Sequence, residues 1–137
     1  MKYALWIVQV LLALAFLASG AMKLLTPMYQ LAANMAWVNA VPELLVRFIG
    51  LAEVAGALGL ILPAATRIQP QLTPLAAAGL ALIMVLASIF HLSRGETFML
   101  APNGVLFLLA VFVAYGRWKW APIAPRNTAV GPVASGV

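Results

Sequence analysis

Four apolar runs, each about as long as a helix that crosses a bilayer, constrain this chain more than any other feature of its sequence. They cover roughly residues 4–25, 43–62, 72–92 and 103–120. A helix needs about 20 predominantly apolar residues to span the hydrocarbon core of a membrane. The sequence therefore predicts an all-α fold, an integral membrane antiparallel four-helix bundle that forms one domain over residues 1–121.

The composition supports a membrane setting and argues against nucleic-acid binding. Hydrophobic residues make up 65% of the chain and charged residues 8%, whereas soluble domains carry about 25% charged residues. A chain this apolar would precipitate in water, so we expect the lipid bilayer as its partner. The net charge of +5 comes from basic residues that flank the apolar runs instead of forming one soluble face.

The chain has no cysteine and one histidine. Disulfides, thiol redox relays, iron–sulfur clusters and cysteine-based zinc sites are therefore excluded. A bis-histidine haem would need a second histidine from elsewhere. We predict no metal site and no cofactor held by the chain itself.

The basic residues predict an orientation, because cytoplasmic loops are enriched in Lys and Arg. One side of the predicted bundle has more of them: Lys2, Arg67, Arg117, Lys119 and Arg126. The other side has fewer, and acidic residues accompany them: Lys23, Arg47 and Arg94, with Glu43 and Glu96. We expect both termini in the cytoplasm, a bacterial inner-membrane location, and a disordered cytoplasmic tail over residues 122–137.

The first run also has a second interpretation. A basic start followed by an apolar stretch and Ala18-Ser-Gly-Ala21 resembles a secretory signal with a cleavage site. Cleavage there would leave three spans. The four-span topology and this alternative both stay open on sequence alone.

Glu53 is the most unusual residue within the spans. It lies about ten residues, or roughly 15 Å, inside the second run, which is too deep for its carboxylate to reach the head groups. A carboxylate there costs roughly 2.5–3.5 kcal/mol on insertion scales and usually marks a site. Arg47 precedes it by six positions, so it is not an i,i+4 partner. We predict that Lys23 or His91 pairs with Glu53, which would otherwise be protonated.

Polar residues collect in the predicted outer half of the bundle, which suggests a pocket with Glu53 at its floor. The candidate ligand-binding residues are Glu53, Lys23, His91, Arg47, Arg94, Asn103 and Trp37. Several have structural interpretations: the basic side chains can reach lipid head groups, and Asn103 can cap the fourth helix. Residues 26–42 resemble a short interfacial amphipathic helix, which either covers the pocket or anchors the chain at the interface.

Three motifs resemble the DoxX-like family of small four-span membrane proteins over about Leu14–Val113. They are Gly20-Ala-Met-Lys23-Leu, Ile49-Gly-Leu-Ala-Glu53-Val-Ala-Gly-Ala-Leu-Gly-Leu60 and His91-Leu-Ser-Arg-Gly-Glu96. The family often has Glu-Leu-Ala-Gly or Glu-Leu-Gly-Gly where this chain has Glu53-Val-Ala-Gly56. The resemblance implies a four-helix membrane bundle. Some relatives are described as subunits of a terminal quinol oxidase or a thiosulfate:quinone oxidoreductase.

Three functions follow as hypotheses. The first is a protein that binds a small or quinone-like ligand, or an accessory subunit whose partner supplies the redox chemistry. The second is a small proton-coupled transporter that uses Glu53 and requires a homodimer. The third is a membrane enzyme that acts on a lipid-soluble substrate, with Glu53 and His91 as acid and base.

Overall fold

The computed structural model describes residues 2–125 and contains four helices long and apolar enough to cross a membrane. These are α1 (Lys2–Leu25), α3 (Glu43–Thr66), α4 (Leu72–Ser93) and a last span over Thr97–Trp120. The last span consists of the 3₁₀ turn η2 (Thr97–Met99), α5 (Leu100–Tyr115) and the π-helical η3 (Gly116–Trp120). The prediction of an all-α membrane bundle is confirmed. The predicted tail lies outside the described residues from 126 onward.

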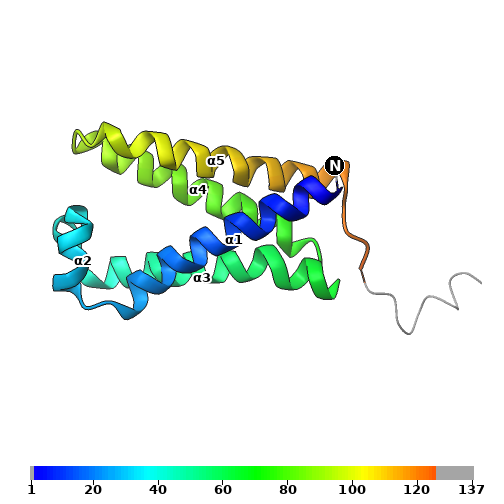
Figure 1. Cartoon of the computed structure of the whole chain (residues 1–137), viewed down its shortest axis with the longest axis horizontal. Helices are drawn as coiled ribbons and strands as arrows, with labels where there is room; N and C mark the ends of the chain where they lie inside the picture. The colour runs from blue at the N-terminus through cyan, green and yellow to red at the C-terminus, as the bar shows by residue number, and fades with distance from the viewer. Residues whose placement is uncertain (1, 126–137) are drawn as a thin grey trace, which may run out of the picture.

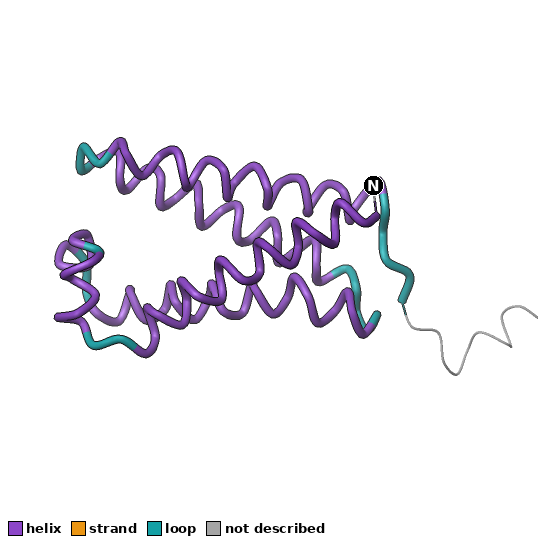
Figure 2. Tube along the Cα trace, in the orientation of Figure 1, coloured by secondary structure: helices purple, strands orange, loops and turns teal. Residues whose placement is uncertain are grey.

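The spans run alternately up and down and are arranged as two helix pairs (Figure 1). α1 packs mainly on α3, and α4 packs mainly on α5, with a further contact between α3 and α4. The pairs meet at the end of the molecule that holds Lys2, here called the terminal end. They diverge toward the opposite end, here called the α2 end, where α2 (Met28–Asn34) lies. Figure 2 shows that the described loops are confined to these two ends.

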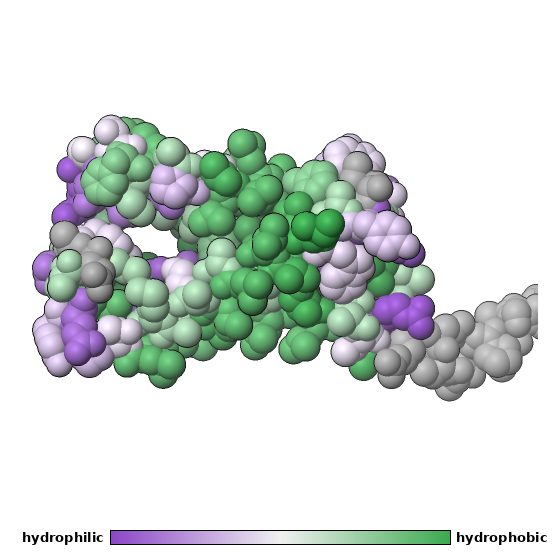
Figure 3. Space-filling model, viewed as in Figure 1, coloured by the Kyte–Doolittle hydropathy of each residue, from purple (hydrophilic) through white to green (hydrophobic). Residues whose placement is uncertain are grey.

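The apolar core lies where the pairs meet. Its fully buried members come from all four spans and include Leu12, Phe16, Leu60, Leu80 and Val113. Leucines on the outer helix faces are exposed and form the apolar band around the middle of the molecule, with hydrophilic residues toward both ends (Figure 3). Such a band matches the hydrocarbon core of a bilayer.

Pro63 lies inside α3 and leaves a backbone acceptor free. Proline has no N–H, so the Gly59 carbonyl oxygen has no donor one turn later in the helix. Thr73, in the first turn of α4, donates its hydroxyl to that oxygen at 3.0 Å. This hydrogen bond links α4 to α3, and it satisfies the Gly59 carbonyl oxygen, which lipid could not do.

The segment between α1 and α3 folds into two short pieces instead of one interfacial helix. α2 is followed by the 3₁₀ helix η1 (Ala36–Ala40), with Met35 in a non-helical conformation between them. Leu31 and Val38 are fully buried and pack with Val46 of α3 in a small second cluster. The segment is therefore held against the bundle by its apolar side chains.

Candidate functional site

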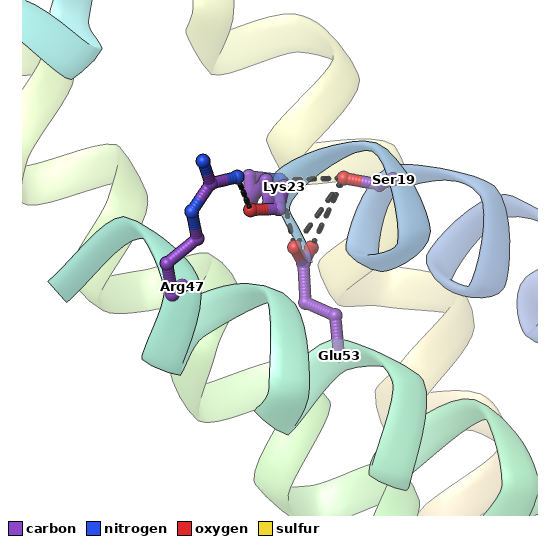
Figure 4. Close-up of polar contacts among 4 residues, drawn as sticks. All are labelled: Ser19, Lys23, Arg47 and Glu53. Carbon is purple, nitrogen blue, oxygen red and sulfur yellow. Dashed lines mark hydrogen bonds and ion pairs between the residues drawn. The ribbon is translucent and has the colours of Figure 1, made fainter. Parts of the chain in front are cut away.

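Glu53 forms a buried ion pair with Lys23. The Lys23 Nζ lies 2.7 Å from the Glu53 Oε1, and the two residues are 7% and 3% exposed. Lys23 also donates to the Ser19 Oγ at 2.6 Å, and the Ser19 hydroxyl lies 3.3 Å from both carboxylate oxygens. Figure 4 shows the three side chains converging from α1 and α3. Of the two predicted partners, the structure places Lys23 on the carboxylate.

The sequence positions this cluster through two features of local structure. Ser19 and Lys23 are four residues apart and share one face of α1, so both side chains meet the same helix. Gly20 and Gly50 lie at the contact, where a β-carbon on Gly50 would be 2.7 Å from the Lys23 Cβ. Because these glycines have no side chains, the two helix backbones can approach closely. The Glu53 carboxylate then reaches the Lys23 ammonium group.

Arg47 supports the cluster from α3 without contacting the carboxylate. Its Nη1 donates to the backbone carbonyl oxygens of Lys23 and Thr26, each at 2.7 Å. Its Nη2 lies 3.3 Å from an exposed Glu43 oxygen one turn earlier. Figure 4 shows the guanidinium beside the Lys23 backbone, away from Glu53. Arg47 thus caps the end of α1, whose last carbonyls lack helical donors.

His91 lies in a separate cluster at the end of α4. Its Nδ1 is 3.1 Å from the Glu96 Oε1, and the Arg94 Nε donates to the same oxygen at 2.8 Å. The hydrogen bond from Arg94, followed by that from His91, lowers the pKa of the Glu96 carboxyl below its usual value of 4.5. The structure therefore gives both His91 and Arg94 the partner Glu96 and does not bring them to Glu53.

Trp37 connects α4 to the segment between α1 and α3 (residues 26–42), here called the α2 segment. Its indole ring packs edge-on against Phe90 and His91, with ring centroids 6.0 and 6.2 Å apart. At the same end of the molecule, Figure 3 shows an opening between the two helix pairs that hydrophilic residues border. The α2 segment therefore contacts both helix pairs at the diverging end of the bundle. Trp37 packs on α4, and Leu31 and Val38 pack on α3.

Asn103 is buried, but it does not cap the last span. α5 begins at Leu100 after η2, which places Asn103 and Pro102 inside its first turn. The capping prediction is wrong because the 3₁₀ turn starts the helix earlier, where Pro102 is tolerated since first-turn N–H groups need no helical acceptor. The Asn103 Nδ2 has no hydrogen-bond partner among residues 2–125.

The comparison with protein families agrees with this architecture. A profile of the DoxX-like family matches residues 7–113. The chain belongs to the DoxX-like family. A search of curated proteins and a search of solved structures each gave no match. With four spans and this membership, the chain is a multi-pass membrane protein.

This DoxX-like protein has a second polar cluster, which was not predicted from the sequence. Near the terminal end, the Gln9 Nε2 donates to the Leu60 carbonyl oxygen at 2.7 Å, and the Arg117 Nε donates to the Gln9 Oε1 at 2.5 Å. Arg117 was assigned to the set of flanking cations that orient the chain. The available signal was Gln9, a polar residue inside an apolar run that needs an interior partner just as Glu53 does.

The two polar clusters are separated by apolar residues. On α1, Leu12 and Phe16 lie between Gln9 and Ser19; on α3, Ala57 lies between Glu53 and Leu60. All three belong to the buried core. Each polar cluster is therefore confined to its own half of the membrane span.

Proposed function

We propose that the Lys23–Glu53 pair of this DoxX-like protein binds the polar head group of a small quinone-like ligand. The observation that carries the proposal is a buried ion pair with unused hydrogen-bonding capacity. Lys23 has three ammonium N–H donors, and two are used by Ser19 and Glu53. The Glu53 Oε2 accepts from the Ser19 hydroxyl alone among the described residues, so it retains lone pairs.

The chemistry of the pair suits both redox states of a quinone. A quinone carbonyl oxygen would accept from the Lys23 ammonium group, and a quinol hydroxyl would donate to the Glu53 carboxylate. Hydrogen bonds to charged groups are stronger than those between neutral groups. The buried Asn103 amide, whose Nδ2 has no described partner, offers a further donor at the same end of the bundle. An isoprenoid tail would lie along the apolar helix faces.

Energetics support a functional reason for keeping the pair. Transferring two charges out of water costs several kcal/mol per ion, and apolar side chains of similar size often give equal or greater stability. In this proposal the chain acts as an accessory subunit at the outer face of a bacterial inner membrane, and a partner subunit transfers the electrons.

The other two hypotheses have less support. A proton-coupled path through Glu53 would have to cross the apolar core between the two polar clusters. An acid–base pair of Glu53 and His91 would need the two to meet, whereas His91 bonds to Glu96. Binding at Lys23 and Glu53 requires neither.

Titration of the purified protein in nanodiscs with decylubiquinone tests the proposal, with Trp37 fluorescence as the reporter. We expect Glu53→Gln and Lys23→Met each to raise the dissociation constant about tenfold, the value of one charge-assisted hydrogen bond. Glu43→Gln is the matched control, because it removes a carboxylate from the exposed start of the same helix. Trp37→Phe separates the local signal from quenching of the three tryptophans near the other end. Equal affinity of all variants would contradict the proposal.

A further inference from the structure

A cavity of about 350 Å³ opens at the terminal end of the bundle, away from Glu53. It lies between the start of α1, the end of α3 and the segment after η3. Its polar lining is basic: Lys2, Arg67 and Arg117, with the Trp6 indole ring beside them. A water molecule takes up about 30 Å³ in the liquid, so the cavity has room for a phosphate group and several waters.

Arg117 is the unusual member of this lining. The residue is 4% exposed, so its guanidinium lies within the protein and not at the lipid surface. Its Nε donates to Gln9 and its Nη1 to the Ala121 carbonyl oxygen at 3.0 Å. Its Nη2 has no hydrogen-bond partner among residues 2–125. The guanidinium carbon lies 5.4 Å from the centre of the Trp6 ring.

No carboxylate side chain compensates this buried charge. The chain has three acidic residues. Glu43 pairs with Arg47, Glu53 pairs with Lys23, and Glu96 bonds to His91 and Arg94. Arginine stays protonated in proteins. The guanidinium therefore has neutral oxygens and a ring face as its described partners, although a buried charge normally requires an opposite charge.

We propose that this cavity binds a phosphate-bearing anion through Arg117, with Lys2 and Arg67 at its rim. The guanidinium presents its N–H groups in a planar fork that matches phosphate oxygens, and the unpartnered Nη2 supplies a donor. Two sources have this chemistry: the head group of an anionic phospholipid and a free phosphate compound. The site lies at the opposite end of the bundle from the proposed quinone site and is independent of it.

Native mass spectrometry of the full-length protein with phosphatidylglycerol and phosphatidylcholine tests the proposal. We expect phosphatidylglycerol to bind preferentially, and Arg117→Gln to weaken it about tenfold through the loss of a charge-assisted hydrogen bond. Arg67→Gln removes an exposed charge at the rim, and it should weaken binding about two- to fivefold without disturbing the buried core. Lys119→Gln is the matched control: it removes an equal charge at the same end from a residue outside the cavity lining.

Thermal unfolding in inorganic phosphate, against chloride at equal ionic strength, distinguishes the two sources. Stabilisation by phosphate that Arg67→Gln reduces would identify a free phosphate compound as a sufficient ligand. Stabilisation by phosphatidylglycerol alone would identify the lipid head group. Equal weakening by Arg67→Gln and Lys119→Gln would overturn the proposal, because it would show general surface attraction. Equal binding of the two lipids, together with no effect of phosphate, would also overturn it.

Discussion

Gly20 of α1 and Gly50 of α3 contact each other backbone to backbone, since a β-carbon added at Gly20 would lie 2.6 Å from the Gly50 carbonyl oxygen. Lys23 and Glu53 each lie three residues beyond one of these glycines, toward opposite ends of the antiparallel pair. The spacing between the two backbones therefore sets the distance between the Lys23 Nζ and the Glu53 Oε1. A packing feature and a candidate binding site are thus controlled by one contact.

Substituting Gly20 with Ala should separate α1 from α3 and weaken the ion pair. Forcing an extra methyl group into a tight contact costs about 1–3 kcal/mol, and we expect a loss of that size in SDS-induced unfolding. Gly79→Ala is the control, because nothing lies within 4 Å of a β-carbon there. Equal stability of the two variants would show that the helices adjust without cost.

The ion pair itself should show strong coupling. Glu53→Gln leaves the buried Lys23 without its counter-charge, and breaking a buried pair costs about 3–5 kcal/mol. The double variant Lys23→Met with Glu53→Leu should recover most of that loss, because it removes both charges. The free energies of unfolding of the unmodified protein, Lys23→Met, Glu53→Leu and the double variant form a double-mutant cycle. A coupling energy near zero would contradict the geometry.

His91 and Glu53 should behave as independent residues. The structure gives His91 the partner Glu96 and places Glu53 with Lys23. We expect the effects of His91→Gln and Glu53→Gln on the free energy of unfolding to add within about 0.5 kcal/mol. A larger coupling would bring back the hypothesis of an acid–base pair.

The contrast between Lys23 and His91 shows what the sequence could and could not predict. The spans followed from composition, because a bilayer requires long apolar helices, and the depth of Glu53 required a polar partner. The choice between Lys23 and His91 depends on how each helix is rotated about its axis. Hydropathy does not encode that rotation when the lipid-facing and core-facing sides are both apolar. Arg117 was missed for the same reason, since a flanking cation and an inward-facing one have the same place in the sequence.

The small residues near Glu53 give a similar lesson. Gly50 and Gly56 lie three residues on either side of Glu53, and by sequence alone such small residues leave room for a ligand, a water or another helix. In the structure, a β-carbon at Gly50 would meet Lys23, and one at Gly56 would meet Leu80 at 2.6 Å. Neighbouring helices occupy both positions. Spacing of small residues predicts close approach, and it does not predict whether a helix or a ligand makes that approach.

The Glu96 cluster predicts how stability depends on pH at the α2 end. The hydrogen bonds from Arg94 and His91 hold the pKa of Glu96 below its usual 4.5. A carboxyl with a lowered pKa in the folded state contributes stability above its unfolded pKa, and this contribution is lost as pH falls through the folded value. Unfolding followed from pH 6 downward should therefore show a loss of stability that begins near pH 4.5. Glu96→Gln should flatten this part of the curve of stability against pH. If the curve of the Glu96→Gln variant matched that of the unmodified protein, the hydrogen bonds of Glu96 with Arg94 and His91 would not form in solution.

The proposed outer location of the Lys23–Glu53 site depends on the orientation of the chain in the membrane. Thr26 lies after α1 at the α2 end, and Gln71 lies before α4 at the terminal end. The chain has no cysteine, so a single cysteine at either position can be labelled without removing others. The excess of Lys and Arg at the terminal end predicts that this end is cytoplasmic. A membrane-impermeant thiol reagent added to intact cells should therefore label Thr26→Cys and leave Gln71→Cys unlabelled until the membrane is opened. Labelling in the reverse order would place the Lys23–Glu53 site toward the cytoplasm, and labelling of both from one side would be incompatible with four spans.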